Sequence, residues 1–339
     1  MISYPLADDP TQMLIAVYDG HGLNGEVISE YAAYALVDAL EADPNALIND
    51  PSEHLRRSIV SMDDGMRAKR SIPSYDSGST AIVALLRGRQ VWVACVGDSR
   101  AIKGTKVAGK SAWRCTDLSV DQKPDDPAER ARIEACGGYV SAASAAYGPA
   151  RVWRGGFGIG PGLAMARSLG DHGVAEVGVT AEPEIVADTL AADDTCLVLA
   201  SDGVWEFVTS EEALAIVQAK AGDASAAAKA LIRESSARWK AMEGNYRDDI
   251  TAIVVFLPVL EGLGPRDSAS VAKQTAVFDT EGQETERGAI TEQSVGIELA
   301  PAPADVLAAA PSAATAGEEN SPAPFIKRRL SMAGNMTNV

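Results

Sequence analysis

The chain has 339 residues and 46% of them are hydrophobic, so it can bury the core of one large domain or of two smaller ones. Its formal net charge is −17 and its pI is near 4.6. A chain this acidic offers no basic stripe to displace counterions from phosphates, which excludes a general nucleic-acid binder. The acidic excess fits a solvated surface or, alternatively, a set of carboxylates that bind divalent cations.

The four cysteines argue against a zinc site and in favour of a reducing compartment. None of them forms a CxxC pair or has a histidine close by in the sequence. Cys95 and Cys196 lie in apolar runs, as buried thiols do. Residues 1–10 have neither the basic region nor the apolar core of a signal peptide, and the longest apolar runs have strand length. We therefore expect a cytoplasmic or nuclear protein without a transmembrane segment.

The first predicted elements are one strand and two helices. An apolar run predicts a buried strand at Met13–Tyr18. Hydrophobic residues at helical spacing then predict a helix over residues 28–40, after Gly25, and another between Pro51 and Arg70. Strands and helices therefore alternate from the start of the chain.

The middle of the chain predicts a pair of core strands and a long loop. Apolar runs at Ala81–Leu86 and Val91–Val96 are joined by a short polar link, which predicts a hairpin with antiparallel pairing. The Gly-rich stretch Ser77–Thr80 lacks the lysine of a phosphate-binding P-loop, so we interpret it as a turn that leads into a core strand. The segment Gly137–Gly162 is rich in Gly, Ala and Ser, which predicts a mobile surface loop.

The last structured part predicts two strands and two helices. Runs at Cys196–Ala200 and Ile250–Phe256 predict buried strands. Between them, Thr209 and Glu212 fit a capping box that begins one helix, and an Ala-rich segment predicts a second helix over Ala224–Met242. Strand pairs mixed with helix pairs indicate layers of sheet and helix, as opposed to a simple alternating βαβ sheet.

Beyond residue 260 the composition changes. From Gly262 onwards Phe278 and Phe325 are the only aromatic residues, and Ala, Pro, Ser, Thr and Glu dominate. Such a segment cannot bury enough apolar surface to offset its chain entropy. We therefore divide the chain into a folded domain over residues 1–260 and a disordered tail over residues 261–339.

Two short patterns in the tail suggest regulation. The sequence Lys327-Arg328-Arg329-Leu330-Ser331 resembles a site for a basophilic kinase, and phosphorylation of Ser331 would change the charge of a basic patch. The alternative is a solvated basic tail. The terminal Thr337-Asn338-Val339 fits the minimal pattern of a PDZ ligand, although patterns of three residues are common by chance.

Three aspartates stand where predicted strands begin or end. Asp19 follows the first strand and is followed by Gly20 and His21; Asp202 follows the Cys196–Ala200 strand, and Asp248 precedes the last one. An Asp-Gly pair at a strand end is most often only a turn. Three such sites together, however, match what hard divalent cations require, which is carboxylate oxygens, backbone carbonyls and water.

A series of motifs resembles one family, the metal-dependent protein phosphatases of the protein phosphatase 2C type. Each motif alone is weak, but their common order is specific. They cover residues 13–257 and comprise Asp19–Gly22, Ser77–Ala81, Val96–Ala101, Leu118–Pro124, Glu129–Val140, Gly162–Asp171, Glu182–Ile185, Ala200–Trp205 and Asp248–Thr251. The resemblance implies an α+β fold, a four-layer α-β-β-α sandwich with two central antiparallel sheets flanked by helix pairs. Residues 1–260 are then the catalytic domain.

The resemblance also implies a cleft that binds two Mn²⁺ or Mg²⁺ ions at one end of the sandwich. By similarity, Asp19 bridges the two cations and the carbonyl of Gly20 adds an oxygen. Asp202 and Asp248 complete the carboxylate set of one cation. Asp121 is similar to the family's ligand of a weaker third cation, which it would share with Asp202.

The implied activity is hydrolysis of phosphoserine and phosphothreonine in phosphoprotein substrates by an enzyme of signalling pathways, and we expect the enzyme to be a monomer. A water activated by the cations attacks phosphorus in line, without a phosphoenzyme. His21, beside Asp19, is placed to protonate the departing oxygen. His54 and His172 receive no role, and Asp98 and Asp171 are interpreted first as structural supports.

One departure from the family leaves an alternative open. The family has a further N-terminal strand with an arginine for the substrate phosphate and an acidic metal ligand, whereas residues 1–18 contain neither Arg nor Glu. The chain is therefore either truncated or without these groups. The alternative function is a weakened or inactive pseudophosphatase that binds phosphoproteins. A second rival, a two-metal phosphoesterase of nucleotides or metabolites, is opposed by the ordered motifs.

Overall fold

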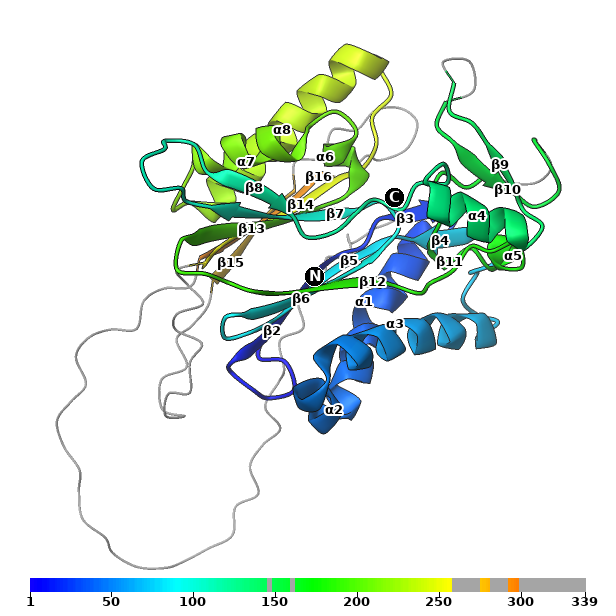
Figure 1. The fold of residues 1–339 in the computed structure, drawn as a ribbon, viewed down its shortest axis with the longest axis horizontal. Helices are drawn as coiled ribbons and strands as arrows, with labels where there is room; N and C mark the ends of the chain where they lie inside the picture. Colours follow the sequence, from blue (N-terminus) through cyan, green and yellow to red (C-terminus); the bar gives the residue numbers. More distant parts are fainter. Residues whose placement is uncertain (145–147, 159–161, 258–274, 281–291, 299–339) are drawn as a thin grey trace, which may run out of the picture.

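The computed structural model describes residues 1–144, 148–158 and 162–257 and two strands, Thr275–Thr280 and Glu292–Glu298. Ser331 and Thr337–Val339 lie outside the described residues, so the two tail motifs stay predictions. Two sheets stack face to face with helices on both outer sides (Figure 1). The predicted α+β sandwich of four layers is confirmed.

The first sheet has five strands, and every neighbouring pair is antiparallel. Its central strands form the predicted hairpin, in which Ala81 pairs with Val96 and Arg87 with Gln90. In spatial order the strands are β1 (Ile2–Ser3), β2 (Gln12–Val17), β5 (Ala81–Arg87), β6 (Gln90–Val96) and β12 (Glu184–Thr189).

The second sheet has six strands and contains one parallel pair, β14 with β16. In spatial order the strands are β15 (Thr275–Thr280), β16 (Glu292–Glu298), β14 (Ile250–Phe256), β13 (Asp194–Ala200), β7 (Arg100–Thr105) and β8 (Arg114–Asp117). The two strands β15 and β16 belong to the segment that the sequence analysis assigned to a disordered tail. Strand β16 pairs with the edge of β14, and β15 pairs in turn with β16. The domain boundary near residue 260 stays a prediction.

Within the described part of the chain, three helices cover the outer face of each sheet. The first sheet carries α1 (Gly25–Ala42), α2 (Pro44–Asn49) and α3 (Pro51–Ala68), and the second carries α6 (Asp202–Trp205), α7 (Ser210–Gln218) and α8 (Ala224–Glu243). Their starts are fixed locally. Asp50 accepts a hydrogen bond from the backbone of Glu53 ahead of α3, and Thr209 with Glu212 forms the predicted capping box of α7.

Successive side chains of the central strands point to opposite faces of their sheet. The two sheets therefore form three apolar layers, one between the sheets and one under the helices on each outer side. In β2, Leu14 and Ala16 face the helices, whereas Met13, Ile15 and Val17 face the other sheet. Strand β13 divides its side chains between the intersheet layer and the α6–α8 layer in the same way. Because both faces of these strands are buried, the residues at the strand ends have fixed positions.

A smaller structure extends from one end of the sandwich (Figure 1). It consists of a three-stranded sheet, a two-stranded sheet and two short helices, and a cluster around Ile133 and Val152 forms its own core. The elements are β3 (Gly20–Gly22), β4 (Ser77–Ser79) and β11 (Leu169–Gly170), then β9 (Tyr139–Ser141) and β10 (Arg151–Trp153), and α4 (Pro127–Ala135) and α5 (His172–Ala175).

Two sequence interpretations are wrong in this region. The stretch Ser77–Ser79 is a strand and not a turn, because β3 and β11 pair with its two edges. The segment Gly137–Gly162 contains the antiparallel pair β9 and β10 where a loop was expected. Small residues obscured both strands, since neither stretch has the apolar alternation that marks a strand. Among the described residues, no helix is long and apolar enough to cross a membrane.

Candidate metal centre

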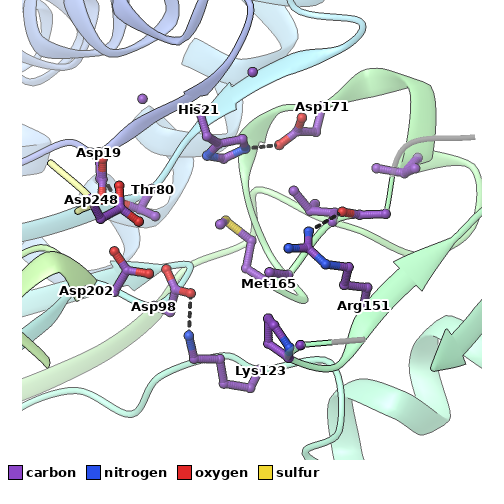
Figure 2. Close-up of a pocket in the computed structure, with 18 of the residues that line it drawn as sticks. Asp19, His21, Thr80, Asp98, Lys123, Arg151, Met165, Asp171, Asp202 and Asp248 are labelled. Atoms are coloured by element: carbon purple, nitrogen blue, oxygen red, sulfur yellow. Dashed lines mark hydrogen bonds and ion pairs between the residues drawn. The ribbon is translucent and has the colours of Figure 1, made fainter. Parts of the chain in front are cut away.

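Four aspartates meet at one end of the sandwich because each sits where a core strand begins or ends. Asp19 follows β2, and Asp98 lies in the link between β6 and β7 that passes from the first sheet to the second. Asp202 follows β13 and Asp248 precedes β14, and because these strands are antiparallel neighbours their two ends adjoin. Figure 2 shows the four carboxylates on one side of a cavity of about 930 Å³.

Backbone contacts hold two of these aspartates in place. The amide of Asp19 donates to Thr80 Oγ1 at 3.1 Å, and that hydroxyl lies 2.7 Å from Ser99 Oγ. On the other sheet, a Cβ at Gly203 would stand 2.1 Å from the carbonyl oxygen of Asp249. Only a glycine lets the start of α6 approach β14 this closely, which brings the neighbouring residues 202 and 248 together.

The proximity of the carboxylates is visible in their pKa values. Burial, followed by the charges of Asp202, Asp248 and Asp98, raises the pKa of Asp19 well above its ordinary value. Burial and the charges of Asp98 and Asp248 raise the pKa of Asp202 to about 7. Burial also raises the pKa of Asp248. Each group therefore resists ionisation, because its neighbours carry the same charge in a poorly solvated place.

The oxygen atoms that these aspartates offer suit hard divalent cations that keep some of their water ligands. Buried carboxylates without a compensating charge are unfavourable, and a divalent cation would offset them. Within the described part of the chain, no group of three or more His, Cys, Asp or Glu side chains is arranged to hold a metal ion by itself. Mg²⁺ binds through one or two carboxylates and keeps several waters, so Asp19, Asp202 and Asp248 with the Gly20 carbonyl are a suitable set.

The structure does not bring Asp121 together with these ligands. Its two carboxylate oxygens accept from Nε and Nη2 of Arg100 at 2.8 and 2.7 Å. The guanidinium fork matches a carboxylate and supplies the opposite charge. Sharing of a third cation between Asp121 and Asp202 therefore stays a prediction that this geometry does not support.

Asp98 and Lys123 are site residues that sequence reasoning did not assign. Asp98 is buried, its charge raises the pKa of Asp19 and Asp202, and its carboxylate lies 2.6 Å from Lys123 Nζ. The lysine thus offsets part of the acidic charge. Both residues belong to motifs that the sequence analysis quoted, and a buried aspartate between two core strands was the available signal.

His21 lies on β3 at the edge of the same cavity and pairs with Asp171 (Figure 2). Its Nε2 is 2.5 Å from Asp171 Oδ2, which also accepts from Ser168 Oγ at 2.6 Å. Burial disfavours the imidazolium, but the hydrogen bond and charge of Asp171 and the charge of Asp98 outweigh it, so the pKa of His21 is raised. The buried Nδ1 of His21 has no hydrogen-bond partner among the described residues.

The position of Asp171 depends on the local backbone. Its φ of 46° lies in the left-handed region, which is unfavourable for an aspartate. Its carboxylate occupies the space above Gly78, where a Cβ would stand 2.1 Å from Oδ2. The neighbouring His172 bonds Ser74 and Asp63 inside the core, and His54 bonds the Leu40 carbonyl, so neither reaches the cavity.

Comparisons with known proteins identify the family. The sequence profile of Protein phosphatase 2C matches residues 2–241. The chain belongs to the protein phosphatase 2C family. Probable protein phosphatase 2C 64 of Oryza sativa subsp. japonica is 35% identical over 247 residues, which are 71% of this chain and 57% of that protein. Probable protein phosphatase 2C 34 of Arabidopsis thaliana is 32% identical over 256 residues, 71% of each chain.

Solved structures of the family share the fold. A serine-threonine phosphatase 2C from Toxoplasma gondii superposes with a TM-score of 0.62 at 22% identity, covering 74% of this chain and 86% of that one. A sex determining protein of C. elegans gives a TM-score of 0.59 at 25% identity, covering 76% and 59%. The similarity to the Toxoplasma structure supports the fold alone, and the chain spans just over half the length of the rice relative.

Like-charge repulsion predicts that Asp202→Asn stabilises the metal-free phosphatase 2C domain. Because the pKa of Asp202 is raised, the folded protein binds this proton more tightly than the unfolded chain, and stability falls as pH rises from 3.8 to about 7. The gain from asparagine is therefore small near about pH 4 and complete above about pH 7. We expect roughly 1–3 kcal/mol, or several degrees in Tm.

Thermal unfolding in EDTA across this pH range measures the effect. Asp125→Asn, an exposed aspartate ahead of α4, is the matched control and should leave Tm within about 1 °C. A lower Tm for Asp202→Asn at neutral pH would contradict the repulsion.

Proposed function

We propose that this chain is a metal-dependent protein serine/threonine phosphatase that hydrolyses phosphoserine and phosphothreonine. The observation that carries the proposal is the convergence of Asp19, Asp202 and Asp248 on the cavity that His21 borders. Family membership supports the same activity. We also propose that the protein works as a monomer in the cytoplasm or nucleus; free cysteines, as expected in a reducing compartment, support that location.

Mn²⁺ or Mg²⁺ are the proposed cofactors. Asp19, Asp202, Asp248 and the Gly20 carbonyl would hold them, and Asp98 lies close enough to add charge. When bound, the cations supply Lewis-acid chemistry: they offset charge on the phosphoryl group and lower the pKa of water. The carboxylates of the chain fix where that positive charge lies, since they are held by strand ends that cannot shift without disturbing the core.

His21 is the proposed general acid and Asp171 its positioning residue. The raised pKa of His21 favours the protonated ring, and Asp171 accepts the hydrogen bond of Nε2–H. For the proton to reach a leaving oxygen, Nε2–H must exchange Asp171 for the substrate. Ser168 keeps Asp171 in place throughout by donating to the same oxygen.

The alternative function is a pseudophosphatase that binds phosphoproteins without hydrolysis. It is favoured by the lack of Arg and Glu in residues 1–18, where β1 pairs with β2 and no basic side chain approaches the cavity from that described segment. The retained carboxylates and His21 favour catalysis. Turnover decides between the two.

The first test is release of phosphate from a phosphothreonine peptide with Mn²⁺. We expect turnover that EDTA abolishes and that Asp248→Asn lowers by about 10²-fold or more, because metals contribute several kcal/mol to such reactions. Asp125→Asn is again the control. Binding of the peptide without any metal-dependent turnover would contradict the proposal and favour the pseudophosphatase.

The second test separates the acid from the metal ligands. His21→Ala should slow hydrolysis of a phosphothreonine peptide by roughly 10²–10⁴-fold, the usual contribution of general acid catalysis. The aryl substrate p-nitrophenyl phosphate should be affected much less, because its leaving group needs little protonation. Asp171→Asn should show the same preference in weaker form. Equal losses on alkyl and aryl substrates would contradict the acid role.

A further inference from the structure

The cavity of the candidate metal centre is lined by positive as well as negative groups. Its described lining includes three lysines and arginines, Lys123, Arg151 and Arg154. Two of them are already neutralised by a carboxylate. Lys123 lies 2.6 Å from Asp98, and Arg154 lies 2.6 Å from Glu176.

Arg151 differs from the other two cations. Among the contacts within the described residues it has no acidic partner, and its Nη1 donates to the carbonyl of Gly162 at 2.6 Å. That bond uses one of the five N–H donors of a guanidinium. The remaining donors and the full positive charge stay available to a ligand in the cavity.

The backbone of Arg151 is held in place by strand pairing. Arg151 pairs with Ser141 in the β9–β10 ladder and its amide donates to the Ser141 hydroxyl at 3.2 Å. The next residue, Val152, is buried and bridges to Leu163. A side chain that leaves such a ladder has a defined direction, which a residue on a free loop would lack.

That direction is across the cavity toward the carboxylates. Figure 2 shows Arg151 on the opposite side from Asp19, Asp202 and Asp248, with its guanidinium pointing inward past Met165. The space between the arginine and the carboxylates is therefore bounded by opposite charges.

A phosphate group suits this space better than any neutral ligand. The carboxylate side alone repels a phosphate dianion, and cations bound there would attract it from one direction only. A guanidinium on the other side can bond two phosphate oxygens at once. We propose that Arg151 binds the phosphate of the substrate and holds it toward the carboxylate end. This inference rests on the proposed function only in naming a phosphorylated side chain as the ligand.

The test uses three variants of the full chain. Arg151→Gln keeps an N–H donor for the Gly162 carbonyl but loses the positive charge. Arg151→Lys keeps the charge but loses the paired N–H donors that can bond two phosphate oxygens at once. Arg154→Gln changes the residue that directly follows β10 and already pairs with Glu176, and it is the matched control. Equal melting temperatures for all proteins verify that they are folded.

The first measurement is binding of a fluorescent peptide that carries the non-hydrolysable phosphonate analogue of phosphoserine, compared with the unmodified peptide. We expect Arg151→Gln to raise the Kd of the phosphonate peptide about tenfold or more, as for loss of a hydrogen bond between charged groups. Arg151→Lys should recover part of that loss. Affinity for the unmodified peptide should not change, and Arg154→Gln should change the phosphonate Kd less than about twofold.

The second measurement is the KM of p-nitrophenyl phosphate, which has a phosphate but no peptide. It should rise with Arg151→Gln by a similar factor. An unchanged Kd and KM in Arg151→Gln, or equal losses in Arg151→Gln and Arg154→Gln, would overturn the inference. If the parent chain binds the phosphonate peptide through Arg151 but turns over no substrate, the proposed function fails and the phosphate site stands.

Discussion

Repulsion among buried carboxylates is the constraint on which this structure depends. Asp19, Asp98, Asp202 and Asp248 lie together where water is scarce, and burial with mutual charge raises the pKa of three of them. A protein gains no stability from such a cluster, so the rest of the fold must supply the free energy that holds it. The cluster makes physical sense only if positive charge, from cations, protons or Lys123, offsets it.

The sandwich supplies that free energy and also the geometry. Three apolar layers bury both faces of the central strands, so the strand ends that carry the aspartates cannot move apart without disturbing the core. The small sheets and the α5 region then place His21 with Asp171, and Arg151, around the same cavity. Negative charge is thereby concentrated on the sandwich side, and the positive charge of Arg151 stands on the side of the β9–β10 pair.

Much of the fold could be predicted from the sequence because its core strands are apolar runs and some of its helices begin at recognisable capping residues. The apolar runs of β2, β5, β6, β13 and β14 and the capping box of α7 are local signals, and the structure has each of them. Strand β4 was missed because its residues are small and its partners β3 and β11 are distant, and β9 and β10 were missed because each has only three residues in a segment rich in Gly, Ala and Ser. Strand β16 likewise depends on the edge that β14 offers, and β15 on the edge of β16.

The residues of the candidate site also fall into those that could be recognised from the sequence and those that could not. Asp19, Asp202 and Asp248 could be recognised because each adjoins a predictable strand. The roles of Asp171, Lys123 and Arg151 could not, since each is defined by a partner between 11 and 150 residues away along the chain. Asp121 stays a prediction as a metal ligand: a motif suggested that role, and in the structure Arg100 of β7 donates to both of its carboxylate oxygens.

The most direct measurement is a calorimetric titration of the metal-free chain with Mn²⁺, with Asp19→Asn as the comparison. The account predicts uptake of about two Mn²⁺ per chain at or below millimolar concentration, and loss of most of that uptake in the variant. No uptake at millimolar Mn²⁺, or the same uptake by both proteins, would contradict the claim that these carboxylates exist to hold cations.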